Sequence, residues 1–239
     1  MKRGWQYIQL LILLVTVVLL YSFSSGRNSH RSRQQMEIAI LHEQNLFVTE
    51  DKIRSMVTGH TAEAEQVMDS LDLYQLEKNL KTYGLIADAE VYETVTKNVG
   101  IEITQREPLA RVMGTPSYYL DTEGAFMPLS DVYTARVPLV GAMDSLSLAK
   151  LFPLLRYIEG DPFLKKQVVS IEKDKAEDYI LKLRQLDFEV NFGNTTAIEK
   201  KMNNFKAFYK KAERDSLLKQ YSLVNLKYTN QVVCTKTEV

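Results

Sequence analysis

Few side chains in this sequence have the type and spacing of a catalytic or metal-binding site. The three histidines, His30, His42 and His60, are scattered, and we interpret His42 and His60 as ordinary residues of a strand and of a helix end. No loop matches a phosphate-binding glycine pattern, and no histidine or cysteine cluster has metal-ligand spacing. The sequence therefore predicts a protein that is not an enzyme and that uses no metal or cofactor.

Asp121 and Glu123 resemble a pair of catalytic carboxylates, but turn chemistry explains them better. They lie in the run Asp121–Gly124 between two short extended segments, which is the composition of a hairpin turn. Cys234 is the single cysteine, so no disulfide can form within the chain. The formal net charge of zero argues against nucleic acid as a partner, because contacts to phosphates need a basic surface. We also expect no small-molecule substrate.

The end of the chain has the pattern of a protein-binding strand. Apolar and polar side chains alternate between Val224 and Cys234 with few exceptions, which predicts one long strand. A terminal strand is often a sheet edge, and its unpaired backbone groups can accept a strand from another chain. The alternative is that this strand is paired within its own sheet. The predicted partner-binding residues are Leu226, Lys227, Tyr228, Thr229, Asn230, Gln231, Val232 and Val233.

The N-terminal segment Trp5–Phe23 is apolar and uncharged, and its length is close to the roughly 20 residues that cross a bilayer. We interpret residues 5–23 as a retained transmembrane helix, residues 1–4 as a cytoplasmic tail and residues 24–34 as a polar linker. The alternative is a secretory signal peptide cleaved near Ser22–Ser24, where serine in place of alanine makes the site weak. Either interpretation exports the rest of the chain.

Residues 35–106 read as one small α+β unit, in the order strand, helix, helix, strand, strand. Strands are indicated by alternation of apolar and polar residues, and helices by apolar residues at helical spacing. We expect both helices to pack on one face of the sheet. The predicted elements are a strand over 36–41, a short helix with Thr49 or Asp51 as its cap, a helix capped by Asp69 or Ser70 and ended by Gly84, and strands over 89–95 and 99–103.

Residues 107–239 read as a mainly antiparallel β domain with flanking helices. Its last helix presents lysines on one face, which is either a docking surface or, as we prefer, an ordinary solvated face. These lysines are Lys200, Lys201, Lys206, Lys210 and Lys211. The predicted elements are extended runs over 111–113, 117–120, 125–127, 136–141, 167–171 and 188–192, a helix over 148–158 bent or shortened by Pro153, and a helix opened by a capping box at Thr196–Glu199.

Several of these stretches, taken in order, resemble one known family. The match extends from about Met36 to Lys236, and the ordered set is more specific than any one motif. The stretches are Ala89–Tyr92, Gly100–Ile103, Gln105–Arg111, Tyr118–Asp121 with Gly124, Met127–Ser130, Arg136–Val140, Asn191–Gly193, Glu199–Lys201 and Asn225–Val233. Together they resemble the POTRA module and the β domain of the bacterial cell-division protein family FtsQ/DivIB. The strand over 36–41 lacks the usual Val-x-Gly of that family.

The resemblance implies a single-pass protein of the cell inner membrane, with its bulk in the periplasm at the division septum. It implies a non-catalytic scaffold whose partners are FtsB and FtsL, with FtsK, FtsW and the septal peptidoglycan synthase as further candidates. In this family the end of the β domain binds FtsB by strand addition, and its Arg-Tyr pair matches Lys227 and Tyr228 here. The alternative is a POTRA-type periplasmic assembly or secretion factor that binds β-rich clients. An anchored cell-wall enzyme would need catalytic residues that the sequence lacks.

Overall fold

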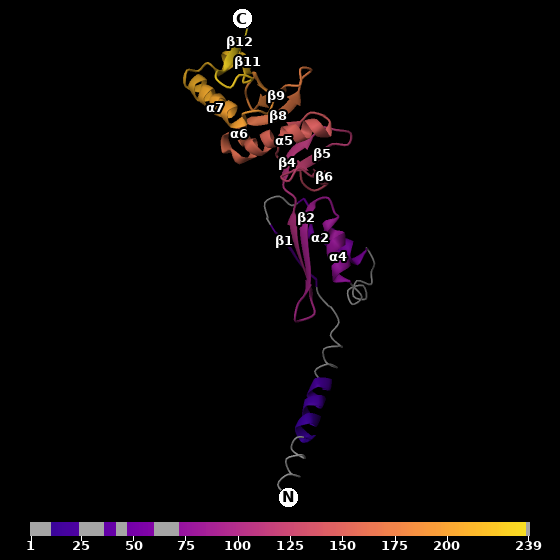
Figure 1. Ribbon diagram of the computed structural model, residues 1–239. Coiled ribbons are helices and arrows are strands. Elements are labelled where there is room, and N and C mark those ends of the chain that lie inside the picture. Colours follow the sequence, from indigo (N-terminus) through magenta and orange to yellow (C-terminus); the bar gives the residue numbers. More distant parts are fainter. Residues whose placement is uncertain (1–10, 24–35, 42–46, 60–71, 238–239) are drawn as a thin grey trace. The chain divides into compact units, whose positions relative to one another are not determined.

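The structure is a computed structural model that describes residues 11–23, 36–41, 47–59 and 72–237. The chain divides into two compact units (Figure 1). The first comprises residues up to 41, 49–82 and 88–104, and the second comprises residues 42–48, 83–87 and 105–239. The three histidines and the predicted linker over 24–34 lie outside the described residues.

Residues 11–23 form a helix whose side chains are exposed. This helix is the described part of the predicted transmembrane segment, whose residues 5–10 lie outside the description. Within the described ranges, no helix has the length and apolar character needed to cross a membrane.

The first unit has the predicted order of strand, helix, helix, strand, strand. Its sheet has the order β1-β3-β2, with β1 parallel to β3. Thr49 caps α2 as expected, because its Oγ1 accepts a hydrogen bond from the Lys52 amide. The prediction for the second helix was wrong at both ends, since Asp72 is the N-cap and Thr82 the C-cap of α4. The elements are β1 (Met36–Leu41), α2 (Glu50–Thr58), α4 (Leu73–Lys81), β2 (Ile86–Glu93) and β3 (Val99–Gln105).

The second unit is built on a nine-stranded sheet in the order β12-β11-β10-β9-β8-β7-β4-β5-β6. Three neighbouring pairs are parallel, namely β4–β7, β7–β8 and β10–β11, and the others are antiparallel, which confirms the mainly antiparallel prediction. The elements are β4 (Pro108–Val112), β5 (Tyr118–Asp121), β6 (Phe126–Met127), β7 (Leu139–Val140), α5 (Ser145–Gly160), α6 (Pro162–Gln167), β8 (Val168–Lys173), β9 (Tyr179–Leu183), β10 (Glu189–Gly193), α7 (Ile198–Arg214), η1 (Leu218–Gln220), β11 (Tyr221–Asn225) and β12 (Val233–Lys236).

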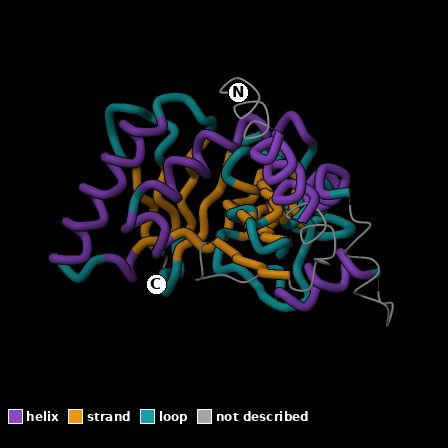
Figure 2. Tube along the Cα trace, turned by 90° about the horizontal axis from the view of Figure 1, so that it is seen from below, coloured by secondary structure: helices purple, strands orange, loops and turns teal. Residues whose placement is uncertain are grey.

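The core of this unit lies between the sheet and its helices, and Figure 2 shows helices running alongside the strands. Leu151 and Leu155 of α5 and Met202 and Phe205 of α7 are buried against strand residues such as Val190. Each helical pair is spaced by three or four residues, so both members lie on one face. The periodicity that predicted these two helices therefore identified the buried faces correctly.

Several local predictions in this unit were wrong. Pro153 does not shorten α5, which continues through it from Ser145 to Gly160. Thr196 does not cap α7, because Ala197 is the N-cap in a left-handed conformation and makes no side-chain cap bond. The extended run over 136–141 forms only the two-residue strand β7. The strand β9 and the helix α6 were not predicted.

The turn at Asp121–Gly124 has the predicted structural role. The Asp121 Oδ1 atom accepts hydrogen bonds from the amides of Glu123 and Ala125 at 3.0 and 2.7 Å, and Gly124 has a φ of 83°. The Asp121 Oδ2 atom lies 2.6 Å from the Arg106 guanidinium. These bonds give the carboxylate a structural role in the hairpin, as turn chemistry indicates.

Candidate binding site at the C-terminal sheet edge

The terminal segment is a hairpin, so the prediction of one long strand from Val224 to Cys234 was wrong. β11 and β12 pair antiparallel, and residues 226–232 connect them. The Asn225 side chain redirects the chain by accepting a hydrogen bond from the Lys227 amide at 2.9 Å. Asparagine commonly forms such local turns, and here this preference outweighs the alternating pattern.

The two strands of this hairpin differ in what flanks them. β11 lies between β10 and β12, whereas β12 is the last strand in the sheet order. Across the hairpin, the Thr237 amide donates to the Gln220 carbonyl at 2.9 Å. Because backbone groups alternate along an antiparallel strand, the amides of Cys234 and Lys236 point to the outer side of β12. That side has no strand partner among the described residues, so β12 is an open edge.

The predicted binding residues do not form one uniform surface. Leu226 is 1% exposed and belongs to the core, and its amide donates to the Asn191 carbonyl at 2.7 Å. Val232 is half-buried against the same core. Tyr228 is 55% exposed, and Val233, the first residue of β12, is 42% exposed. Leu226 is therefore unavailable to a partner, whereas Tyr228 and Val233 are accessible.

Besides the Leu226 amide bond, three contacts that involve side chains hold the segment 226–232 to the rest of the unit. The Lys227 ammonium lies 2.6 Å from Asp178, a carboxylate with a side chain that is 12% exposed. The Thr229 carbonyl accepts a hydrogen bond from the Asn204 amide group at 3.0 Å. The Asn230 Oδ1 atom accepts one from the Lys200 ammonium at 2.8 Å, and Gln231 is exposed. We call residues 226–232 the anchored turn.

The electrostatics of the anchored turn depend on the pair formed by Lys227 and Asp178. The hydrogen bond to Asp178 raises the pKa of Lys227, so this lysine stays charged across the neutral range. Lys227 is therefore already paired within its own chain, and we do not count it as a free cation for a partner's carboxylate.

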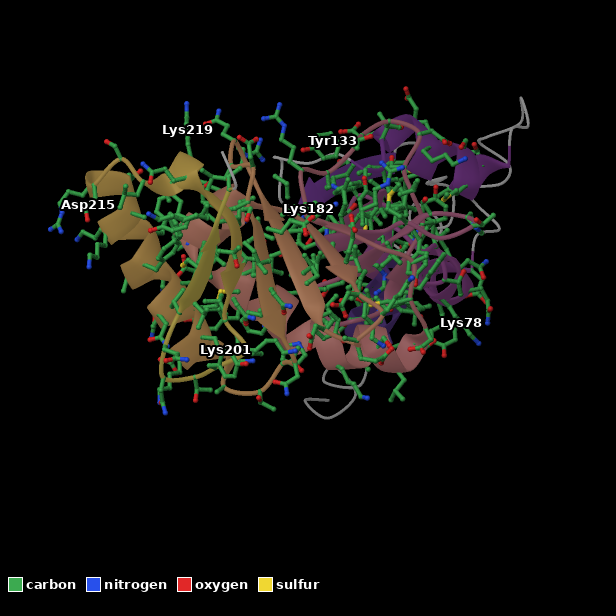
Figure 3. The ribbon with its side chains drawn as sticks, turned by 90° about the horizontal axis from the view of Figure 1, so that it is seen from above. Lys78, Tyr133, Lys182, Lys201, Asp215 and Lys219 are labelled. Atoms are coloured by element: carbon green, nitrogen blue, oxygen red, sulfur yellow. The ribbon has the colours of Figure 1, made fainter. Side chains whose placement is uncertain are left out.

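Lys201 joins the first turn of α7 to the end of β10. The prediction that Lys201 lies on the exposed basic face was wrong, because this side chain is 1% exposed. Its ammonium donates to the carbonyls of Phe192 and Asn194 at 3.1 and 2.8 Å and lies 4.8 Å from the centre of the Phe192 ring. Burial lowers the pKa of Lys201. Figure 3 shows Lys201 beside the strands at one end of α7 and Asp215 at the other end.

The site offers backbone and side-chain contacts rather than reactive groups. In the part of the chain that the structure describes, no group of three or more histidine, cysteine, aspartate or glutamate side chains could hold a metal ion. Burial raises the pKa of the Cys234 thiol, which keeps it in the less reactive protonated form. The described groups at this edge are therefore backbone amides and carbonyls together with the exposed side chains of Tyr228 and Val233.

Reasoning from the sequence missed the residues that form the actual edge and those that anchor the turn. Thr235 and Lys236 belong to β12. Asp178, which directly precedes β9, and Asn204 of α7 hold the anchored turn in place. A signal for the turn was present in Asn230, which interrupts the alternation. The anchors had no such signal, because their partners lie 25 to 49 residues away in the sequence.

Comparison with known proteins identifies the family. Residues 107–235 match the family model described as FtsQ/DivIB, C-terminal related, and residues 34–104 match a POTRA-like domain. A search of curated proteins found no match to this chain. The first family model covers more than half of the sequence, and it includes the nine-stranded sheet except for Lys236, the last residue of β12. The chain therefore belongs to the FtsQ/DivIB family, with a POTRA-like domain preceding the C-terminal domain.

Proposed function

We propose that this protein is a non-catalytic scaffold of the bacterial division machinery that captures a partner by strand addition at β12. The FtsQ/DivIB family consists of division-site membrane proteins that generally have no catalytic activity. The observation that carries the proposal is the open outer edge of β12, in the domain that matches this family.

Strand addition would allow the four-residue strand β12 to bind a partner protein. A partner strand laid against β12 would exchange hydrogen bonds with the outward backbone groups of Cys234 and Lys236. Val233 and Thr235 are exposed beside these groups and would contact alternate side chains of the partner. Backbone bonds supply affinity in this mode, and neighbouring side chains supply specificity.

The anchored turn supplies the specific part of the surface. Tyr228 is a large, exposed aromatic residue on a backbone fixed by Lys227, Thr229 and Asn230. A partner that binds a preorganised side chain loses less conformational freedom on association than one that must order it. We therefore assign Tyr228 as the main side-chain contact and Lys227 as a residue that positions the turn.

The proposed partners are those of the family. FtsB is the proposed strand donor, FtsL its companion, and FtsK, FtsW and the septal peptidoglycan synthase are further members of the assembly. We propose that residues 5–23 anchor the chain in the inner membrane as a single-pass helix, with the POTRA-like domain and the C-terminal domain in the periplasm. This topology would place β12 on the same side of the membrane as the synthase that the scaffold serves.

Deletion of Tyr228–Val239 tests the proposal in cells. We expect the truncated protein to remain in the membrane fraction but to lose co-purification with FtsB and localisation to midcell. Phe126→Ala at the opposite sheet edge serves as the control and should retain both. Co-purification of FtsB with the truncated protein at the wild-type level would exclude strand addition at β12.

A further inference from the structure

A second surface of the C-terminal domain has the composition of a site for an acidic segment. A groove of about 820 Å³ lies between the chain leading into β7 and the junction of α6 with β8. Its volume is within the range of about 300–1,000 Å³ that ligand sites usually occupy. The groove is distant from β12 in the sheet, because the strands β9, β10 and β11 lie between β8, which borders the groove, and β12.

Four cations and no carboxylate line this groove. The cations are Arg136, Lys165, Lys166 and Arg184, and all four are exposed. Lys165 forms an ion pair with Glu159 at 2.5 Å. The other three have no carboxylate partner among the described residues, so three positive charges at one groove are uncompensated.

One hydrogen bond fixes the geometry of the wall that carries Arg184. The Arg184 Nε atom donates to the Lys166 carbonyl at 3.0 Å, which holds the guanidinium against α6. A guanidinium held in this way still has its terminal N–H groups available, and their fork geometry suits a carboxylate. The groove therefore offers oriented donors and not only diffuse positive charge.

The floor of the groove and the sheet pairing favour a polypeptide as the ligand. Val137, Pro138, Val168 and Val169 line the groove between the cations and give it an apolar floor. The ladder between β7 and β8 contains only the pairs Leu139–Ser170 and Val140–Ile171, so the groove residues 136–138 and 167–169 precede the paired part of both strands. An extended chain that alternates acidic and aliphatic side chains could contact both the cations and this floor.

We propose that this groove binds an acidic, extended segment of a partner protein, at a site separate from β12. Its carboxylates would pair with Arg136, Lys166 and Arg184, and its aliphatic side chains would cover Val137 and Val169. Binding would depend on charge, so it should weaken as the ionic strength rises. Such a second contact would let the scaffold hold two partners, or two segments of one partner, simultaneously.

The test uses the full chain in detergent and a fluorescein-labelled peptide of alternating glutamate and valine, with a glutamine–valine peptide as its uncharged counterpart. Fluorescence anisotropy should show binding of the acidic peptide alone. Replacing Arg136, Lys166 and Arg184 by glutamine should weaken binding at least about tenfold, the size expected when several charge contacts are lost. Replacing Lys210, Lys211 and Lys219, which do not line the groove, should leave binding within about twofold.

The control variant at Lys210, Lys211 and Lys219 removes the same number of positive charges, and all three lysines are exposed. Figure 3 shows Lys219 at the surface of this domain. Lys236→Pro, which alters the β12 edge, should not change binding of the acidic peptide, and this separates the groove from strand addition. Equal losses in the two triple variants, or equal binding of the glutamine peptide, would overturn the proposal. Binding of phosphatidylglycerol vesicles or inorganic phosphate through Arg136, Lys166 and Arg184, with no binding of the peptide, would also overturn it.

Discussion

The two edges of the nine-stranded sheet differ in length and in the exposure of their side chains. β6, at one edge, has two residues, and one of them, Met127, is fully buried. The chain that follows β6 bonds back to the domain, with the Ala135 amide donating to the Tyr119 hydroxyl and the Ser130 hydroxyl donating to the Phe47 carbonyl. β12, at the other edge, has four residues with mostly exposed side chains.

On the basis of this difference we propose that β12, and not β6, is the edge that accepts a partner strand. Very short edge strands and covering loops are common protections against unwanted pairing. β6 has the first of these protections, while β12 is longer and lies beside a fixed turn that presents Tyr228. The predictions below separate the contribution of the β12 backbone from that of the turn and from that of the other edge.

Removal of one backbone N–H from the outer side of β12 should reduce FtsB binding more than any other single substitution. Lys236→Pro eliminates an N–H on the outer side of β12 and adds a ring there, so we expect FtsB binding to fall about 100-fold or more. Lys236→Ala keeps the amide and removes only the charge, and it should change affinity less than about threefold. Isothermal titration with full-length proteins measures both. Similar affinities for the two variants would show that the outer backbone is not used.

Truncation of the exposed Tyr228 side chain should have the second-largest effect on partner binding. Tyr228→Ala should weaken partner binding about 30-fold, equivalent to about 2 kcal/mol, the cost typical of an interface hot spot. The anchored turn should keep its conformation, because its bonds come from Lys227, Thr229 and Asn230. The same titration, with amide chemical shifts of residues 226–232 as a control for structure, checks this. A change of less than twofold would remove Tyr228 from the proposed contact.

A substitution that makes the anchored turn more mobile, but leaves its exposed side chains unchanged, should weaken partner binding moderately. Asp178→Asn removes the carboxylate that pairs with Lys227, so the turn should become more mobile and partner binding should fall about fivefold. Asp187→Asn, an exposed carboxylate for which no ion pair is found in the described part of the chain, is the matched control and should bind normally. If the Lys227 ammonium instead contacts the partner, Asp178→Asn will bind as tightly as the wild type.

A smaller effect should be visible in the pH dependence of stability. The hydrogen bond to Asp178 raises the pKa of Lys227, so the pair stabilises the folded state below the ordinary lysine pKa near 10.5. That stabilisation should disappear as the pH rises through the raised pKa, because the ammonium then loses its proton. The difference in unfolding free energy between wild type and Lys227→Met should therefore be constant from pH 7 to about pH 10 and should shrink above it. A constant difference at every pH would contradict the assigned pair.

Changes at the opposite edge should have the smallest effect on binding. Phe126→Asp places a charge on β6, where Phe126 is 59% exposed, and partner affinity should stay within about twofold of wild type. A pull-down in parallel with Lys236→Pro makes the comparison direct. Loss of binding in Phe126→Asp, with an unchanged unfolding transition, would show that the two edges do not differ in the proposed way.

Local chemistry explains which parts of this fold could be predicted from the sequence. The order β1-α2-α4-β2-β3 and the inner faces of α5 and α7 follow from apolar periodicity, which depends on neighbouring residues. The turn at Asp121 follows from the preferences of aspartate and glycine. β9 was missed because its alternation is short and lies among charged residues, and Ala197 took the place of the predicted cap because Thr196 bonds to Asn194 instead.

The candidate site was harder to predict because its decisive contacts are long-range. Alternation over 224–234 indicated an edge at the end of the chain, and β12 is such an edge, but the same pattern hid the turn at Asn225. Leu226 and Val232 pack into the core while Tyr228 and Val233 stay exposed, and this difference depends on tertiary packing. The burial of Lys201 could not be inferred from a lysine-rich helix, because it depends on carbonyls at the end of β10.

Amide hydrogen exchange at β12 tests the strand-addition mechanism most directly. In the free protein the amides of Cys234 and Lys236 should exchange quickly, because they point to the outer side, while Thr235 and Thr237 face β11 and should exchange more slowly. Saturating FtsB should slow exchange at Cys234 and Lys236 strongly and should leave Phe126 and Met127 unchanged. FtsB binding that leaves exchange at Cys234 and Lys236 unaltered would contradict capture through this edge.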